Sequence, residues 1–266
     1  MRWLLLALLL VPLVSLAFWL SLPSAQPLAR AFPKSTALMD TRDSQAHGKA
    51  HKRWTPVPLA RISPWLQKAV VNSEDARFYE HKGVDTKETE AAIEKAMERG
   101  HLGRGASTLT QQLAKNLWLG EERSLLRKLR ELVLAHELES LGKERILELY
   151  LNVVEWGQGA WGAEAASQQW FGVDASQLSP AQAAILTAML PAPRRRDPRH
   201  PSPRLVQRAL EVLDLYGMYH QLSNVELTRE RAQLLELLGV TRQPPPPPEP
   251  SPAPSDAPDD IDESEP

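Results

Sequence analysis

Residues 105–116 read GASTLTQQLAKN, a stretch that joins the signals of a helix start to a row of polar side chains. A glycine leads into a serine and a threonine at the position of a helix cap, and two glutamines follow inside the expected helix. The free amide groups of such a helix start favour an anion. Gln112, Lys115 and Asn116 are spaced three to four residues apart, so we expect them on one side of this helix.

Apolar residues recur at helical spacing on both sides of this stretch. No run of alternating β-branched residues is long enough to require a sheet. We therefore expect an all-α, or mainly α, domain. The predicted helices are 123–141, 143–151, 180–190, 205–216 and 225–238.

Charge and proline content divide the chain into four segments. The 20 residues 3–22 carry no charge, and a helix of that length would be about 30 Å long, the thickness of the hydrocarbon core of a bilayer. The last 23 residues hold 10 of the 23 prolines and no base, a composition typical of a disordered, extended tail. We predict a single transmembrane anchor at 1–22, a linker at 23–51, a folded domain at 52–243 and a disordered acidic tail at 244–266.

The apolar N-terminal segment has a second interpretation, a signal peptide that is cleaved at the small-residue pattern of residues 29–31. Apolar regions of signal peptides usually span only about 7–15 residues, so the uncleaved anchor is favoured. The short flank before the segment carries only positive charge, which favours a cytoplasmic N-terminus, although Arg30 and Lys34 follow on the other side.

The formal net charge of -2 combines two parts of opposite sign. All 31 basic residues lie in 1–243 together with 26 of the 33 acidic ones, so this part carries +5 and the tail carries -7. A positive domain suits an anionic lipid surface or a phosphate-bearing substrate. The chain has no cysteine, which excludes a disulfide framework, a thiolate nucleophile, an iron–sulfur cluster and cysteine-bound zinc.

Motifs of several other functional classes are absent from the sequence. The glycines at 103–105 lack the spacing of a dinucleotide or P-loop site, and His136 lacks the second histidine of a zinc protease. No Gly-x-Ser-x-Gly elbow occurs, and no nucleic-acid-binding motif accompanies the basic residues. These absences argue against nucleic acid as a partner.

Three polar runs remain as candidates for a site: EDARFYEHKG at 74–83, the stretch 105–116, and RKLRE at 127–131. Each has an ordinary structural explanation when it is taken alone. Carboxylates beside a helix end commonly act as caps, paired glutamines make a polar helix face, and Arg127 with Glu131 forms an i,i+4 ion pair. Spacing alone therefore leaves their role open.

Taken together and in order, these runs resemble the motifs of the bacterial peptidoglycan glycosyltransferase (transglycosylase) family. Two further stretches match as well, KERILELYLN at 143–152 and RALEVL at 208–213, and Leu109 replaces an isoleucine of the family pattern. The resemblance covers residues 54–216, and the short sequence after it leaves no room for a transpeptidase domain. The chain is thus similar to the monofunctional biosynthetic enzymes of this family.

The resemblance implies a lysozyme-like helical fold with a small membrane-facing lobe, for which residues 84–102 and 117–119 are candidates. It implies a peptidoglycan polymerase that transfers a lipid-linked glycan chain onto lipid II. An α-linked donor becomes a β-1,4 link by a single displacement with inversion, and undecaprenyl diphosphate is released. The catalytic domain would then stand in the periplasm, at the outer face of the bacterial inner membrane.

The resemblance also implies roles for individual residues. Glu74 is the expected general base, and Glu131 is the second family carboxylate, acting either directly or by organising the cations beside it; we expect both in one cleft. No cofactor is required, and although divalent metal accompanies some family members, the sequence shows no dedicated metal site. The residues expected to bind substrate are Ser107, Thr108, Gln111, Gln112, Lys115, Asn116, Arg123, Arg127 and Lys128.

The expected partners are lipid II, the lipid-linked glycan strand and membrane lipids, with cell wall or division proteins as further candidates. The arginines at 194–196 are expected near lipid headgroups. A lytic glycan cleaver and a membrane-tethered scaffold are the alternative functions. A cleaver has no need of cations around a diphosphate, so Lys115, Arg123 and Arg127 favour the polymerase, and a scaffold does not account for the five motifs.

Overall fold

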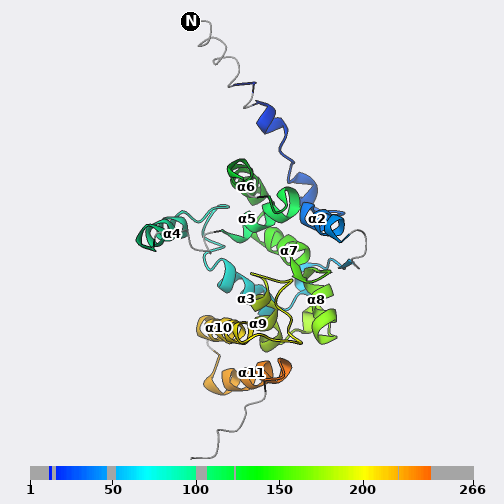
Figure 1. The fold of residues 1–266 in the computed structure, drawn as a ribbon, viewed down its shortest axis with the longest axis vertical. Helices are drawn as coiled ribbons and strands as arrows, with labels where there is room; N and C mark the ends of the chain where they lie inside the picture. Colours follow the sequence, from blue (N-terminus) through cyan, green and yellow to red (C-terminus); the bar gives the residue numbers. More distant parts are fainter. Residues whose placement is uncertain are drawn as a thin grey trace, which may run out of the picture.

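The structure, a computed structural model, is built mainly from helices and describes residues 12–13, 16–46, 52–99, 107–122, 124–220 and 222–240 (Figure 1). The mainly α fold expected from the sequence is thereby confirmed. The α-helices are α2 (Ala37–Gln45), α3 (Pro64–Glu74), α4 (Thr86–Arg99), α5 (Leu109–Ala114), α6 (Leu125–Leu138), α7 (Lys143–Val153), α8 (Gly162–Phe171), α9 (Pro180–Met189), α10 (Pro203–His220) and α11 (Asn224–Leu237). Shorter helical turns are η1 (Gln26–Ala29), η2 (Leu59–Arg61), η3 (Lys115–Leu119), η4 (Glu139–Leu141) and η5 (Ala175–Gln177).

Helix α9 is packed among α3, α10 and α11 (Figure 1). Ser179 caps α9 by accepting a hydrogen bond from the Gln182 backbone, and Pro180 occupies its first turn, as the sequence predicts. The alanine-rich body of α9 is buried on nearly all sides, which lets the neighbouring helices approach closely. The other predicted helices are confirmed as α6, α7, α10 and α11, with ends that differ by a few residues.

A small three-stranded sheet packs against α8 and consists of β1 (Arg53–Trp54), β2 (Glu155–Gly157) and β3 (Ala160–Trp161). Strand β3 is central: β1 pairs with it in parallel, with Arg53 opposite Ala160, and β2 pairs with it antiparallel. Strands of two or three residues are too short to produce an alternating pattern, so the sequence shows no sign of this sheet.

Residues 26–45, inside the predicted linker, are folded against the domain. They form η1 and α2, and Leu38 and Met39 of α2 are buried. Arg145 of α7 donates a hydrogen bond to the Leu28 carbonyl at 2.8 Å. The structure therefore differs from the predicted linker, because α2 buries only two side chains and this is too few to show a helical period in the sequence.

Helix α4 projects from the side of the domain, as expected for part of a small lobe (Figure 1). Leu117, another candidate for that lobe, is instead buried in the core. Exposed leucines are found on α6, at Leu125, Leu126 and Leu129.

None of the helices in the described part of the chain is long and apolar enough to cross a membrane. Residues 1–11, 14 and 15 of the predicted anchor lie outside the described residues, and so does the predicted tail at 244–266. The anchor and the disordered tail therefore stay predictions.

Gly162, at the start of α8, allows a close approach between α8 and α7. Its φ is +79°, and a Cβ there would lie 2.6 Å from the Asn152 carbonyl oxygen. Gly162→Ala is expected to lower the free energy of unfolding by about 3 kcal/mol, because backbone strain and steric overlap add. Gly142→Ala is the matched control: its φ is +83° but nothing lies within 4 Å of the added Cβ, so about half that loss is expected. Urea denaturation of both variants measures the difference, and equal losses would contradict it.

Candidate active site

The end of α3 and the start of α5 meet at a buried carboxylate, Asp75. Asp75 Oδ2 accepts a hydrogen bond from the Leu109 backbone at 2.9 Å, and His81 Nε2 lies 3.0 Å from both carboxylate oxygens. A carboxylate at the first amide of a helix is favourable. This network joins the first two sequence motifs and fixes Glu74, the last residue of α3, beside the first turn of α5.

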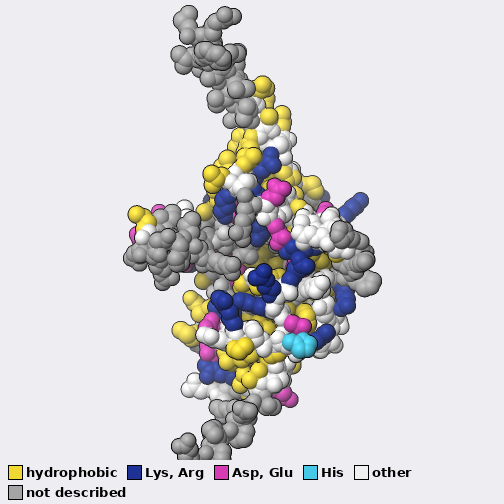
Figure 2. Space-filling view, in the orientation of Figure 1, with side chains coloured by type: hydrophobic (Ala, Val, Ile, Leu, Met, Phe, Trp, Pro, Cys, Tyr) yellow, Lys and Arg dark blue, Asp and Glu magenta, His cyan; other side chains and the backbone are white. Residues whose placement is uncertain are grey.

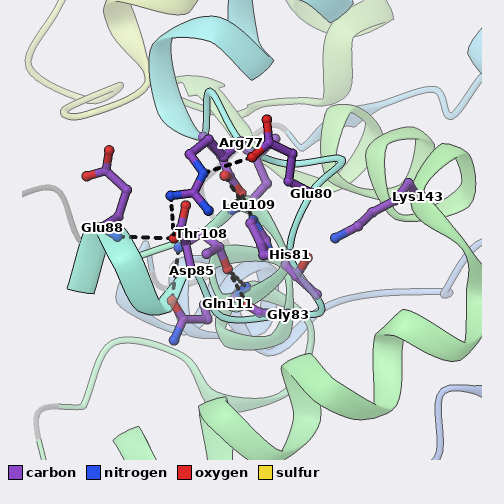
Figure 3. A network of polar contacts seen from close by, with 12 residues as sticks. Arg77, Glu80, His81, Gly83, Asp85, Glu88, Thr108, Leu109, Gln111 and Lys143 are labelled. Atoms are coloured by element: carbon purple, nitrogen blue, oxygen red, sulfur yellow. Dashed lines mark hydrogen bonds and ion pairs between the residues drawn. The ribbon is translucent and has the colours of Figure 1, made fainter. Parts of the chain in front are cut away.

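Thr108 and Gln111 belong to the same network and form a capping box at the start of α5. Thr108 Oγ1 accepts from the Gln111 backbone, and the Gln111 side chain accepts from the Thr108 backbone at 2.9 Å. The Thr108 hydroxyl also donates to the Gly83 carbonyl at 2.6 Å (Figure 3). Both side chains are buried and hydrogen-bond within the chain, and their contact with substrate stays a prediction.

A cleft of 980 Å³ opens beside Glu74. Three residues that were predicted to bind substrate line it, namely Ser107, Gln112 and Lys115. A smaller cavity of 210 Å³ shares Glu74 and Ser107 with the cleft and is also bordered by Thr108. The opposite wall of the cleft comes from α10 and the segment before it, with Arg196, Arg204, Gln207, Arg208 and Glu211.

Glu74 is partly buried, and its surroundings determine how readily it ionises. Burial raises the pKa of Glu74 above its ordinary value, and the charge of Asp75 adds to the rise. Gln112 Nε2 opposes it by donating to Glu74 Oε2 at 3.3 Å, as do the positive charges of Arg208 and Arg196. A carboxylate with a raised pKa is a better proton acceptor, so Glu74 has the properties of a general base.

Lys115 begins η3, a π-helical turn that continues α5. Such turns are rare and are frequently found at functional sites. Burial lowers the pKa of Lys115, while the charge of Glu131 opposes the shift and that of Arg127 adds to it. Asn116, expected on the cleft side of the helix, is buried and does not line the cleft. A π-helical turn spaces residues differently around the helix axis. The α-helical spacing of three to four residues, from which Asn116 was expected on the cleft side, therefore does not apply here.

Helix α2 packs against η3 and so supports the turn that carries Lys115. Arg42 of α2 donates to Glu121, which lines the cleft, at 2.5 Å, and to the buried Glu155 at 3.2 Å. This segment, expected as a linker, is therefore part of the support of the site.

The third motif forms a cluster of cations around a carboxylate on α6. Glu131 is 4% exposed; Arg127 Nη1 donates to its Oε2 at 2.6 Å, and Lys128 Nζ donates to its Oε1. Lys128 Nζ also lies 3.4 Å from Ser107 Oγ, at the cleft. Glu131 itself does not line the cleft, so the expectation that both carboxylates open into it holds for Glu74 only.

Three arginines that line the cleft lie outside the predicted set of site residues: Arg196, Arg204 and Arg208. Figure 2 shows Lys and Arg side chains gathered across the middle of this face of the domain. Arg208 donates to Ser73 Oγ at 2.9 Å, which holds α10 beside the end of α3, and Arg196, expected near lipid headgroups, lies in the cleft. The signal of Arg204 and Arg208 in the sequence is a polar row at i, i+3, i+4 and i+7 along α10, which Gln207 and Glu211 complete.

Within the described residues, no group of three or more His, Asp or Glu side chains is arranged to hold a metal ion. The expectation that no metal is required is not tested by this finding. Arg123, predicted to face the donor diphosphate, lies outside the described residues.

Comparison with known proteins matches this chain to one family. A family model described as "Transglycosylase" covers residues 41–216, which include all five motifs and the residues of the cleft. A protein of Thiobacillus denitrificans named "Biosynthetic peptidoglycan transglycosylase" is 47% identical over 188 residues, 69% of this chain and 81% of the relative. A protein of Herminiimonas arsenicoxydans with the same name is 42% identical over 220 residues, 81% of this chain and 94% of the relative. The chain therefore belongs to the transglycosylase family of peptidoglycan-synthesising enzymes.

Proposed function

We propose that this protein polymerises peptidoglycan glycan strands, for cell wall synthesis, by transferring a lipid-linked glycan chain onto lipid II. The observation that carries the proposal is a partly buried carboxylate, Glu74, in a cleft bordered by Lys115, Arg196 and Arg208. A group that accepts a proton and cations that attract a diphosphate are the two requirements of this transfer. Membership of the transglycosylase family agrees with it.

In the proposed reaction, Glu74 accepts the proton of the acceptor 4-hydroxyl while that oxygen forms a bond to the anomeric carbon of the donor. The bond from this carbon to the diphosphate oxygen breaks, and undecaprenyl diphosphate leaves with the electron pair. Attack from the face opposite the leaving group converts an α-linked donor into a β-1,4 link. General base catalysis of this kind contributes about 10²–10⁴-fold to a rate.

The leaving diphosphate gains negative charge, and Lys115 is the cation best suited to meet it. It lines the cleft, and its partial burial reduces the screening of its charge by water. Lys128 stands next to Ser107, and Glu131 holds Lys128 and Arg127 in place. We assign Glu131 to this organising role, because both of its carboxylate oxygens are held by cations and it does not line the cleft.

The exposed leucines of α6 suit contact with a lipid surface. Leu125, Leu126 and Leu129 are 92%, 53% and 50% exposed. The N-terminal segment lies beside them, since the Arg130 guanidinium is 6.0 Å from the centre of the Phe18 ring. These contacts support a lipid surface next to α6 and the N-terminal segment. The proposal of a single-pass anchor in the inner membrane, with a cytoplasmic N-terminus and the catalytic domain in the periplasm, rests on the uncharged segment 3–22 and the positive charge before it.

The full chain, given labelled lipid II in detergent, tests the proposal against its alternatives. Polymer that lysozyme digests is the expected product. Shortening of finished glycan strands, with no polymer made from lipid II, would favour the lytic cleaver. Neither activity would favour the non-enzymatic scaffold.

The rate of polymerisation is expected to depend on pH through Glu74 and Lys115. Glu74 acts as a base only when it is ionised, and burial raises its pKa. The midpoint of the fall in rate on the acid side should therefore lie above the ordinary glutamate pKa of about 4.3. Lys115 acts only when charged, and burial lowers its pKa, so the alkaline fall should begin below the ordinary lysine value of about 10.4. A pH–rate profile of the wild-type chain measures both limits. An acid limb centred at or below about 4.3 would contradict the role given to Glu74.

A further inference from the structure

Tyr150 of α7 is completely buried, and its hydroxyl belongs to a chain of hydrogen bonds that ends at the proposed base. The hydroxyl donates to Gln112 Oε1 at 3.0 Å, and Gln112 Nε2 donates to Glu74 Oε2 at 3.3 Å. Three helices, α7, α5 and α3, supply one residue each. Tyr150 lies in the fourth motif, at 143–152, to which the mechanism above gives no role.

The direction of these hydrogen bonds depends on the hydroxyl. An ionised Glu74 accepts hydrogen bonds and cannot donate one, so the NH₂ end of the Gln112 amide must face it. The amide oxygen of Gln112 then faces Tyr150, which has to be the donor. If the amide turned round, its oxygen would lie against the carboxylate, and the two would repel each other.

We propose that Tyr150 is a positioning residue whose hydroxyl holds the Gln112 amide with its NH₂ group toward ionised Glu74. This deepens the proposed function and rests on it for the role of Glu74 as base. Without the hydroxyl, the amide loses the partner that selects its orientation, and the Gln112 oxygen loses its donor. Glu74 then holds a proton more readily, so a smaller share of the enzyme has its base available at a given pH.

Several charged groups surround Glu74, and replacing Tyr150 leaves all of them in place. The Tyr150 hydroxyl itself stays neutral, because burial raises its pKa well above the ordinary value and the charges of Glu74 and Asp75 add to the rise. Tyr150 therefore acts on Glu74 as a hydrogen-bond donor and not as a charge. The charged groups are Asp75 at the end of α3, Lys115 in η3, Glu121 after η3, Arg196 before α10, and Arg204, Arg208 and Glu211 of α10.

The test is the titration of Glu74 in the full chain, followed by NMR of ¹³C-labelled glutamate carboxyl groups, with Glu74→Gln to assign the signal. Tyr150→Phe keeps the ring and removes only the hydroxyl, whereas Gln112→Met removes the amide. Each is expected to move the Glu74 midpoint upward by about 0.5–1 pH unit. The double variant should move it no further than Gln112→Met alone, because the hydroxyl acts through the amide.

In Tyr150→Phe, the acid limb of the pH–rate profile should move to higher pH by the same amount as the Glu74 midpoint. The rate on the plateau should change little. Tyr216→Phe is the matched control, because Tyr216 is a buried tyrosine of α10 that does not line the cleft. It should leave both the midpoint and the acid limb unchanged.

An unchanged midpoint of the Glu74 titration in Tyr150→Phe overturns the proposal. A loss of rate in Tyr150→Phe that is equal at every pH would also contradict it, because such a loss indicates only structural damage. A shifted midpoint in a protein that makes no polymer from lipid II would support the positioning role and overturn the proposed function instead. If thermal unfolding shows that Tyr150→Phe does not fold, Gln112→Met tests the amide through which Tyr150 acts, and an unchanged midpoint there overturns the proposal.

Discussion

Glu74→Gln is expected to lower the rate of polymerisation by about 10²–10⁴-fold while the protein stays folded. Glutamine keeps the shape of the side chain beside Gln112, but it cannot accept the proton of the acceptor hydroxyl. The loss should appear in kcat at saturating lipid II, because the groups proposed to hold the diphosphate are unchanged. Single-turnover assays with labelled lipid II measure this step.

The same variant should be at least as stable as the wild type at neutral pH. The pKa of Glu74 is raised in the folded protein, so folding favours the protonated carboxyl group. This contribution to stability is fully present at pH values below the pKa of Glu74 in the unfolded chain, and it is lost as pH rises through the pKa of Glu74 in the folded protein. Near pH 7 the ionised group therefore opposes folding, and a neutral glutamine does not. Thermal unfolding measures this, and a clearly less stable variant would point to a structural cause for its lost activity.

Glu80→Gln is the control for Glu74→Gln. Glu80 lies in the same motif, is exposed, and pairs with Arg77 outside the cleft. It should polymerise lipid II at the wild-type rate. Equal rates for Glu74→Gln and Glu80→Gln would remove the assignment of Glu74 as base.

Glu131→Gln is expected to lower both stability and activity. Both oxygens of this buried carboxylate are held by cations, so the change leaves Arg127 and Lys128 without their partner. Breaking a buried pair costs about 3–5 kcal/mol, and because the two cations are partly exposed we expect a loss of about 3 kcal/mol. The released cations repel each other, Lys128 no longer stays beside Ser107, and the rate should fall by about 10²-fold.

Glu139→Gln is the matched control for this second effect. Glu139 pairs with Lys143 at 2.9 Å and accepts a hydrogen bond from Thr110 Oγ1, and it does not line the cleft. Urea denaturation should show lower stability for both variants, whereas rates measured where both are folded should fall only for Glu131→Gln. Full activity in folded Glu131→Gln would mean that Glu131 does not organise the site.

Features with a local signature could be predicted from the sequence. Ser179 and Pro180 mark the start of α9 because capping and the first turn depend only on neighbouring residues. Glu74 opens a continuous motif at 74–83, and the resemblance of that motif to the transglycosylase family, rather than its local spacing, predicts it as a site residue. Such signals survive in the sequence because they depend on residues within one or two turns.

Features that depend on tertiary contacts were harder to predict. Arg204 and Arg208 reach the cleft because α10 packs against α3 and α9, and no local pattern specifies that packing. Residues 26–45 fold against the domain as η1 and α2, and their place there depends on distant residues such as Arg145 of α7, which a reading of the local sequence does not reveal.

The pH dependence of the residual rate in Glu74→Gln tests most directly whether ionised Glu74 is the base of polymerisation. In the wild type, the rate should fall on the acid side as Glu74 takes up a proton. In Glu74→Gln, the residual rate should show no such fall over the same range, because the group that titrates is absent. A Glu74→Gln variant that keeps the acid limb of the wild type would contradict this role, since another group would then supply the base.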